Sequence, residues 1–271
     1  LILIGDAQTG LITSILIDHG DHNSADRYHL PEVDWADIQR CLSITGDDSV
    51  WLQQKEGFRA FSAGEIMVPP VIYLPFEGRG DLHLKGAHRY EGDIYVFKIA
   101  TAFSNNVERS LEPSQGIMLA FDARTAEPIM VLRDEGHLTD MRTAIAGRNA
   151  AEEMMPANAL MGVGVLGTGV QARLQIALLK NLYPACNKLT VWGRSRENTI
   201  NYAKEVAATG WDVSIVDSPK QVADSSNLLI TTTASEVALL DANDISMQNT
   251  VIIAIGADMP GKVELSPALL Q

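Results

Sequence analysis

The pattern of apolar and polar positions changes once along the chain, near residue 138. Before that point, short apolar or alternating runs are separated by Gly, Pro and Asn, which is typical of antiparallel strands joined by turns. These runs cover residues 71–74, 82–84, 93–99, 116–121 and 129–132. Together with the mixed-polarity region at residues 1–60, they predict an α+β domain.

After residue 138, apolar strands alternate with helical stretches. The predicted strands are residues 161–166, 188–192, 213–216, 228–233 and 251–255, and the predicted helices are residues 139–153, 172–182 and 198–208. Thr139 is expected to cap the first helix, and Ser218-Pro219 is typical of a helix start. Apolar strands alternating with helices indicate a parallel sheet covered on both faces. The sequence therefore predicts an α/β fold, with a Rossmann-type doubly wound parallel sheet at residues 139–271 and an α+β substrate and dimerisation domain at residues 1–138.

Charge and cysteine content narrow the classes of partner. Asp and Glu number 34 against 21 Lys and Arg, and the net charge of −13 disfavours nucleic acid and anionic membranes as partners. Cys41 and Cys186 form no CxxC pair, so neither a disulfide framework nor a zinc knuckle is predicted. No apolar run approaches the roughly 18 residues of a transmembrane helix, and the apolar start is too short for a signal peptide. We expect a cytoplasmic protein.

Two further features of the sequence are its ends and a polar cluster near its start. The chain lacks an initiator Met and stops at Gln271 soon after a strand, so we expect a truncated C-terminus. Residues 18–23 combine Asp, His and Asn, which are metal-ligand types, but Gly, Asp and Asn also favour turns. We interpret this cluster as a solvated turn and predict no metal site.

A glycine-rich segment predicts a dinucleotide site. Gly167, Gly169 and Ala172 form a G-x-G-x-x-A pattern that follows an apolar strand and opens a helix. The first glycine allows a tight turn, the second lets backbone approach a pyrophosphate, and the alanine lets the helix pack closely. The N–H groups at the helix start, at Val170 and Gln171, suit phosphate oxygens. Thr232, near the end of a later strand, is placed in the same site.

The end of the second strand of this domain indicates which cofactor is preferred. NAD-binding domains carry Asp or Glu there for the ribose 2′-hydroxyl, whereas this sequence reads Trp192-Gly193-Arg194-Ser195-Arg196. Two guanidinium groups and a hydroxyl suit a 2′-phosphate, so NADP(H) is favoured over NAD(H). The alternative for Arg194 and Arg196 is a solvated basic turn, and NAD(H) then stays open.

Three motifs, in order, are similar to those of a known family. The stretches at residues 137–144, 167–173 and 256–262, with residues 121–125 before them, resemble the ornithine cyclodeaminase/mu-crystallin family from about Pro69 to the end. The resemblance implies a homodimer, with a substrate domain joined to a Rossmann domain. Members include cyclodeaminases, ketimine reductases, alanine dehydrogenases and ectoine-degradation proteins, so it implies an amino acid or cyclic imine as substrate.

The resemblance also implies roles for individual residues. Arg142 and Lys98 match the family residues that hold the substrate carboxylate, Asp258 matches the proposed acid/base, and Lys262 falls on a lysine near the cofactor. From the residues alone, Arg142 also fits a surface salt bridge, and Asp258 also fits a loop cap. Many members have an arginine after the Pro-Pro region, which is absent here. Lys85 is the candidate replacement, and its alternative is an edge-strand lysine that aids solubility.

Two classes of function follow from these motifs. The first is an enzyme that transfers hydride between a nicotinamide cofactor and an amino or imino acid. The alternative is an NADP-dependent small-ligand-binding protein of the mu-crystallin type with little turnover. The presence of Lys98, Arg142 and Asp258 favours the enzyme, and the sequence names neither its substrate nor its favoured direction.

Overall fold

The computed structural model describes residues 2–5, 12–16, 30–258 and 261–270, so the polar cluster at residues 18–23 lies outside the described residues. The chain divides into two compact units, Leu1–Thr139 and Asp140–Gln271. Helix α3 (His137–Met154) begins in the first unit and continues into the second.

In its described part, the first unit is built on a seven-stranded sheet in the order β3-β9-β8-β7-β6-β4, with β5 paired to β6. The strands are β3 (Glu32–Val33), β4 (Ile66–Met67), β5 (Ile72–Phe76), β6 (Gly80–Arg89), β7 (Ile94–Ala102), β8 (Ser114–Asp122) and β9 (Pro128–Leu132). The pairs are antiparallel except for the parallel pair of β3 with β9. A separate antiparallel pair joins β1 (Ile2–Gly5) to β2 (Ile12–Leu16). The short helix η1 (Ser104–Arg109) connects β7 to β8.

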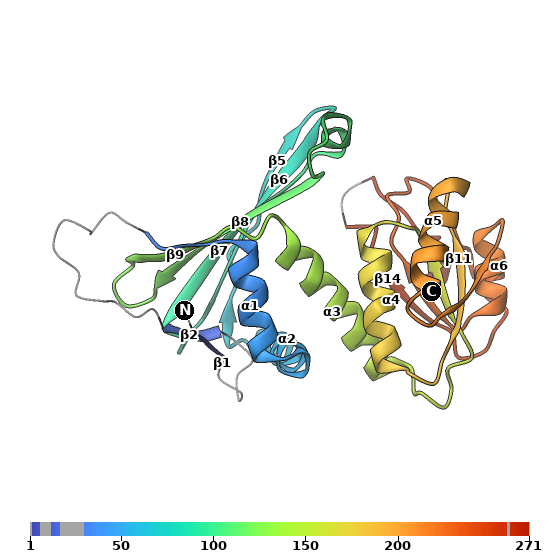
Figure 1. Ribbon diagram of the computed structural model, residues 1–271, viewed down its shortest axis with the longest axis horizontal. Coiled ribbons are helices and arrows are strands. Elements are labelled where there is room, and N and C mark those ends of the chain that lie inside the picture. The colour runs from blue at the N-terminus through green and yellow to red at the C-terminus, as the bar shows by residue number, and fades with distance from the viewer. Residues whose placement is uncertain (1, 6–11, 17–29, 259–260, 271) are drawn as a thin grey trace. The chain divides into compact units, whose positions relative to one another are not determined.

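Two helices of this unit, α1 (Trp35–Thr45) and α2 (Asp47–Ser62), were not predicted. The Asp34 carboxylate caps α1 by accepting the N–H of Asp37 at 2.9 Å. Ile38 of α1 is buried against Ala120 of β8 and Met130 of β9, so α1 covers part of the sheet (Figure 1). The β5 end of the sheet extends beyond this covered part (Figure 1).

The second unit confirms the predicted doubly wound sheet. Its five parallel strands run in the order β12-β11-β10-β13-β14. They are β10 (Val163–Leu166), β11 (Lys188–Trp192), β12 (Asp212–Ile215), β13 (Leu228–Thr231) and β14 (Val251–Ala254). The helices after α3 are α4 (Val170–Leu182), α5 (Arg196–Ala207), α6 (Pro219–Ser225), η2 (Ala242–Asp244) and η3 (Pro267–Leu270). The strand order reverses between β10 and β13, which is where such sheets open a ligand crevice at their carboxyl ends.

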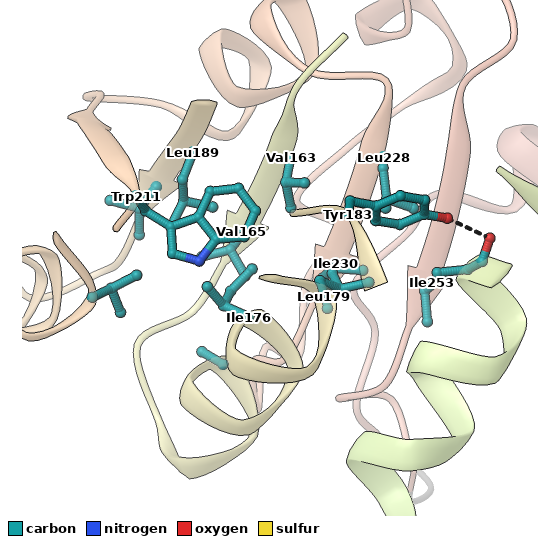
Figure 2. Packing of buried hydrophobic residues seen from close by; sticks show 14 of the residues in the cluster. Val163, Val165, Ile176, Leu179, Tyr183, Leu189, Trp211, Leu228, Ile230 and Ile253 are labelled. Carbon is teal, nitrogen blue, oxygen red and sulfur yellow. Dashed lines mark hydrogen bonds between the residues drawn. The ribbon is translucent and has the colours of Figure 1, made fainter. Parts of the chain in front are cut away.

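Apolar side chains cover both faces of this parallel sheet. On one face, Val163 and Val165 pack with Ile176 and Leu179 of α4 (Figure 2). On the other face, a cluster that contains Leu166 and Leu229 includes residues of α6. Burial on both faces explains why the central strands β10 and β13 are mostly apolar, and removing this area from water is the main favourable term in folding.

The two predicted helix starts had different outcomes. The Ser218 hydroxyl caps α6 by accepting the N–H of Gln221, and Pro219 is the first helical residue, which confirms that prediction. The prediction that Thr139 caps α3 is wrong. Helix α3 begins two residues earlier, and the Asp134 carboxylate accepts the N–H of Leu138 at 3.1 Å. Thr139 instead lies inside the helix.

Candidate functional site

A cleft of about 700 Å³ is lined by residues that follow the carboxyl ends of β10, β11 and β13. It brings together four residues that the sequence placed in the dinucleotide site: Gly167, Arg194, Ser195 and Thr232. Its other lining residues are Thr168, Trp192, Gly193, Asn198, Thr233, Ala234, Ser235, Glu236, Val237 and Leu239. Thr168, Trp192 and Gly193 belong to motifs that the sequence analysis used, whereas the other lining residues were missed. A polar run directly after the apolar strand β13 is a signal that could have found the segment at 233–235.

The glycine loop is held by main-chain hydrogen bonds to both neighbouring strands. The Gly167 N–H donates to the Trp192 carbonyl at 2.9 Å, and the Thr232 N–H donates to the Leu166 carbonyl at 2.9 Å. Gly167 has φ +114°, and a Cβ there would lie 2.6 Å from the Thr232 hydroxyl oxygen. Only glycine satisfies both the turn and this close approach.

The start of α4 lacks a side-chain cap. Gly169 is its N-cap residue and makes no side-chain hydrogen bond, whereas Ser195 and Ser218 cap α5 and α6. A Cβ built on Gly169 would meet nothing within 4 Å, so the backbone faces open space. The first N–H groups of a helix need outside acceptors, and the helix dipole favours anionic ones. This end of α4 can therefore take phosphate oxygens.

The Arg173 side chain holds the backbone carbonyls of the glycine loop. Its Nη1 donates to the carbonyls of Thr168 and Gly169, and its Nε donates to Glu205 of α5 at 2.7 Å. The hydrogen bond from Arg173 lowers the pKa of the Glu205 carboxyl. Sequence reasoning gave Arg173 no role, because the carbonyls that it contacts are defined only by the folded loop.

The two arginines after β11 have different surroundings. Arg194 lines the cleft. Arg196 is the first residue of α5 and pairs with Asp217 at 3.3 Å, with both side chains largely exposed. Ser195 lies between them, and its Oγ accepts the Asn198 N–H at 3.3 Å, which leaves its hydroxyl proton available for another acceptor.

The Gln171 side chain contacts α3. Its Nε2 donates to the backbone carbonyl of Asp140 at 3.1 Å and to the Asp140 carboxylate at 3.2 Å. One turn later, Gln175 donates to the Thr143 carbonyl at 3.3 Å. These two amides hold α4, which begins at the glycine loop, against the helix that carries Arg142.

Charged residues gather around Arg142 and the loop after β14. Arg142 is an exposed residue, but partial desolvation of its guanidinium lowers its pKa, and the carboxylates of Asp140 and Asp258 oppose this change by Coulomb attraction. Asp258 Oδ1 lies 2.7 Å from Lys262 Nζ, and the Asp258 side chain is 66% exposed. The structure thus brings Arg142, Asp258 and Lys262 into one electrostatic neighbourhood, in which Asp258 keeps access to solvent.

In the first unit, Lys98 of β7 donates to the Thr139 hydroxyl at 3.0 Å. Lys85 of β6 is directly opposite Lys98 in the register of the two strands and is exposed. Strand β6 has β7 on one side and β4 and β5 on the other. The β5 pairing ends at Leu84 and the β4 pairing covers His88 and Arg89, so Lys85 itself faces no paired strand on that side among the described residues, and its edge-strand interpretation stays open.

Among the described residues there is neither a candidate membrane-spanning helix nor a candidate metal cluster. No described helix combines the length and apolar character needed to cross a membrane. Likewise, within the described ranges, no group of three or more His, Cys, Asp or Glu residues could hold a metal ion.

Comparisons with known proteins place the chain among relatives. A putative dehydrogenase of Rhizobium meliloti (strain 1021) is 29% identical over 215 residues, covering 79% of this chain and 64% of the relative. Alanine dehydrogenase of Archaeoglobus fulgidus is 29% identical over 233 residues, covering 84% of this chain and 68% of the relative. The solved structure of an archaeal alanine dehydrogenase dimer with bound NAD has a TM-score of 0.78 and 25% identity, covering 89% of this chain and 72% of that chain.

This chain spans less than two thirds of the length of the first of these relatives. The model of the ornithine cyclodeaminase/mu-crystallin family matches residues 39–271, a longer stretch than the resemblance from Pro69. The motifs and the Rossmann-type sheet agree with that match. The chain belongs to the ornithine cyclodeaminase/mu-crystallin family.

Proposed function

We propose that this protein is an NADP(H)-dependent oxidoreductase acting on an amino acid or on a cyclic or acyclic imino acid. The observation that carries the proposal is the cleft at the carboxyl edge of the parallel sheet, which joins the glycine loop to Arg194. The alanine dehydrogenases among the relatives support the class of reaction. A bound nicotinamide would supply or accept the hydride.

The glycine loop and the start of α4 would hold the cofactor pyrophosphate. Gly169 offers open space next to N–H groups that no side chain caps. The backbone N–H groups of Val170 and Gln171 are in the first turn of α4 and would donate to phosphate oxygens. The Gln171 side chain bonds to Asp140, so this residue would serve the cofactor through its backbone. Thr232 would line the opposite wall of the cleft.

The preference for NADP(H) over NAD(H) is supported by the residues after β11. A Cβ on Gly193 would lie 2.6 Å from the Thr199 hydroxyl oxygen, which leaves no room for the acidic side chain of an NAD site. Arg194 lines the cleft and would bind the 2′-phosphate, with the Ser195 hydroxyl as a second donor. Arg196 would contribute less, because Asp217 already neutralises it.

Arg142, Lys98 and Lys85 would hold the substrate carboxylate. Within the first unit, Lys98 donates to the Thr139 hydroxyl at 3.0 Å, which fixes its ammonium group. Lys85 faces the same side of the sheet as Lys98 and would supply the charge of the missing arginine. A guanidinium binds a carboxylate through two parallel hydrogen bonds and so fixes its orientation.

Asp258 would carry the proton that accompanies hydride transfer. Interconversion of an amine and an imine moves a proton at nitrogen, or activates water against the imine carbon. Asp258 is exposed and follows β14, at the sheet edge where ligands of such folds bind. Lys262 pairs with it and would hold the carboxylate in place beside the cofactor.

We further propose that the two domains have different roles and that the protein forms a homodimer. Residues 1–138 would bind substrate and dimerise, and residues 139–271 would bind the cofactor. Apolar side chains at Met67, Val68, Val71, Ile72, Tyr73 and Leu74 are each between 43% and 54% exposed, and a second copy would cover them. Light scattering at micromolar concentration tests this, and a monomer alone would contradict it.

The activity is tested by following nicotinamide absorbance. The chain is mixed with NADPH and a panel that contains pyruvate with ammonia and several cyclic imino acids. Oxidation of NADPH by at least one of them is expected. Tight binding of NADPH without turnover of any probe would instead favour a binding protein of the mu-crystallin type.

A further inference from the structure

Glu264 is a buried carboxylate with four hydrogen bonds. The residue is 1% exposed. Its Oε2 accepts the Thr231 hydroxyl at 2.7 Å and the Gly256 N–H at 2.8 Å. Its Oε1 accepts the Thr233 N–H at 2.5 Å and the Thr233 hydroxyl at 2.8 Å. Burying a carboxylate is costly unless such charge-assisted bonds compensate, so this arrangement serves a purpose beyond filling space.

The donors belong to two different loops. Thr233 follows β13 and lines the nucleotide cleft. Gly256 follows β14 and lies two residues before Asp258. The loops touch closely here, since a Cβ on Gly256 would lie 2.1 Å from the Thr233 carbonyl oxygen. Glu264 therefore connects the wall of the cleft to the loop that presents Asp258.

We propose that Glu264 is a positioning residue, which fixes the Asp258 loop against the cofactor cleft. The proposal rests on the function proposed for Asp258. Glu264 is not among the lining residues of the cleft, and both of its oxygens are occupied. It acts through the loops rather than on the substrate.

The bonding pattern explains why a carboxylate is required. Each oxygen accepts one backbone N–H, from Thr233 on one side and from Gly256 on the other. A glutamine has a single acceptor oxygen, so in either orientation of its amide one of these N–H groups faces another donor. The threonine hydroxyls can rotate to accommodate the change, whereas the backbone N–H groups cannot. Glu264→Gln therefore releases one loop with almost no change in volume.

The first test measures loop order by hydrogen exchange, independently of activity. In Glu264→Gln, amide exchange should become at least about 10-fold faster in the segment at 232–237 or the segment at 255–258, and stay unchanged in β10 and β11. Tyr183→Phe is the matched control, because it removes buried hydrogen bonds to the carbonyls of Ala151 and Met155, neither of which belongs to these loops. Figure 2 shows Tyr183 among the apolar side chains that pack on the parallel sheet. Unchanged exchange in both loops of Glu264→Gln would overturn the proposal.

The second test is a double-mutant cycle with Asp258→Asn, assayed with NADPH and the best imino acid of the panel. Glu264→Gln alone should lower kcat by about 10- to 100-fold, the scale of a small misplacement of a reacting group. In the Asp258→Asn background it should lower kcat by less than about 3-fold, because the group it positions is already gone. If Glu264→Gln lowered kcat by the same factor in the parent and in Asp258→Asn, the substitution would act by general damage to the fold, and the positioning role would be refuted. If Asp258→Asn alone stays active while amide exchange in the loops becomes faster in Glu264→Gln, then the proposed role of Asp258 is wrong. The proposal that Glu264 connects the two loops would still be supported.

Discussion

Lys85 and Lys98 lie directly opposite each other across β6 and β7, so their side chains emerge on the same face of the sheet. Like charges in directly opposed positions destabilise a pair of strands. Lys98 offsets part of this cost by donating to Thr139, whereas Lys85 is exposed. Two facing lysines cost stability unless an anion lies between them. A bound ligand, such as a substrate carboxylate, would supply that anion.

Lys85→Met should therefore separate stability from function. Removing one of two facing charges should leave the melting temperature unchanged or raise it, while kcat/KM for the imino acid falls by at least about 10-fold. Lys188→Met, an exposed lysine at the start of β11, is the control and should alter neither quantity. An unchanged kcat/KM in Lys85→Met would mean that its ammonium group is merely solvated.

Arg142→Lys tests whether the planar guanidinium fork matters. The substitution keeps the charge but loses the two parallel hydrogen bonds to a carboxylate. We expect kcat/KM to fall by about 10- to 100-fold, with NADPH affinity nearly unchanged, as measured by steady-state kinetics and fluorescence titration. A silent substitution would make Arg142 a structural residue that pairs with Asp140 and Asp258.

The glycine loop and the start of α4 were predictable because their signals are local. Gly167 and Gly169 lie in one loop, and their roles follow from a turn and a helix start that the sequence pattern marks. The central strands were found for a related reason, since β10 and β13 are buried at every position and mostly apolar, whereas the edge strand β12 alternates exposed and half-buried residues.

What could not be predicted depends on partners far apart in the sequence. Lys98 and Thr139 are 41 residues apart, and this contact and the Asp134 cap explain why Thr139 was misread as a helix cap. Glu264 reaches donors that lie 31 and 33 residues earlier. The helix α2 was missed because apolar residues such as Leu52 and Phe58 are exposed, so its pattern marks no single buried face.

Arg194→Ala and Arg196→Ala form a matched pair for cofactor choice. Arg194→Ala should weaken NADPH binding by about 1.5 to 3 kcal/mol, the range of a charge-assisted hydrogen bond, and leave NADH binding unchanged. Arg196→Ala should have a smaller effect, because its guanidinium already pairs with Asp217. Fluorescence titration of each variant with both cofactors checks this. Parent chain that binds NADH as tightly as NADPH would contradict the proposed preference.

The hydrogen bonds of Asp241 predict that part of the free energy of unfolding is lost at acidic pH. Hydrogen bonds from the Ser266 hydroxyl and from Asn243 lower the pKa of the Asp241 carboxyl. A lowered folded-state pKa adds stability above the unfolded-state pKa near 4, and that stability is lost as the pH falls through the folded-state value. Unfolding of Asp241→Asn should therefore depend less on pH below about pH 4. Parallel stability curves for parent and variant would argue against this link.

Asp258→Asn is the decisive variant for the proposed chemistry. The Asp258 carboxylate accepts a hydrogen bond from Lys262 Nζ at 2.7 Å. Asp258→Asn separates a role in proton transfer from the alternative role as a loop cap. Asparagine keeps an oxygen that can accept from Lys262, but its amide cannot exchange a proton with a substrate nitrogen or with water.

The variant should fold, bind NADPH like the parent and lose at least about 100-fold in kcat, the lower end of what general acid/base catalysis contributes. Asp212→Asn, an exposed residue at the start of β12, is the isosteric control and should keep full activity. Because Lys262 loses its charged partner in Asp258→Asn, NADPH affinity must be measured separately, so that a binding defect is not mistaken for a catalytic one. Activity within a few-fold of the parent, at equal stability and cofactor affinity, would mean that another group carries the proton. The Asp258–Lys262 pair would then serve to shape the loop beside the cleft.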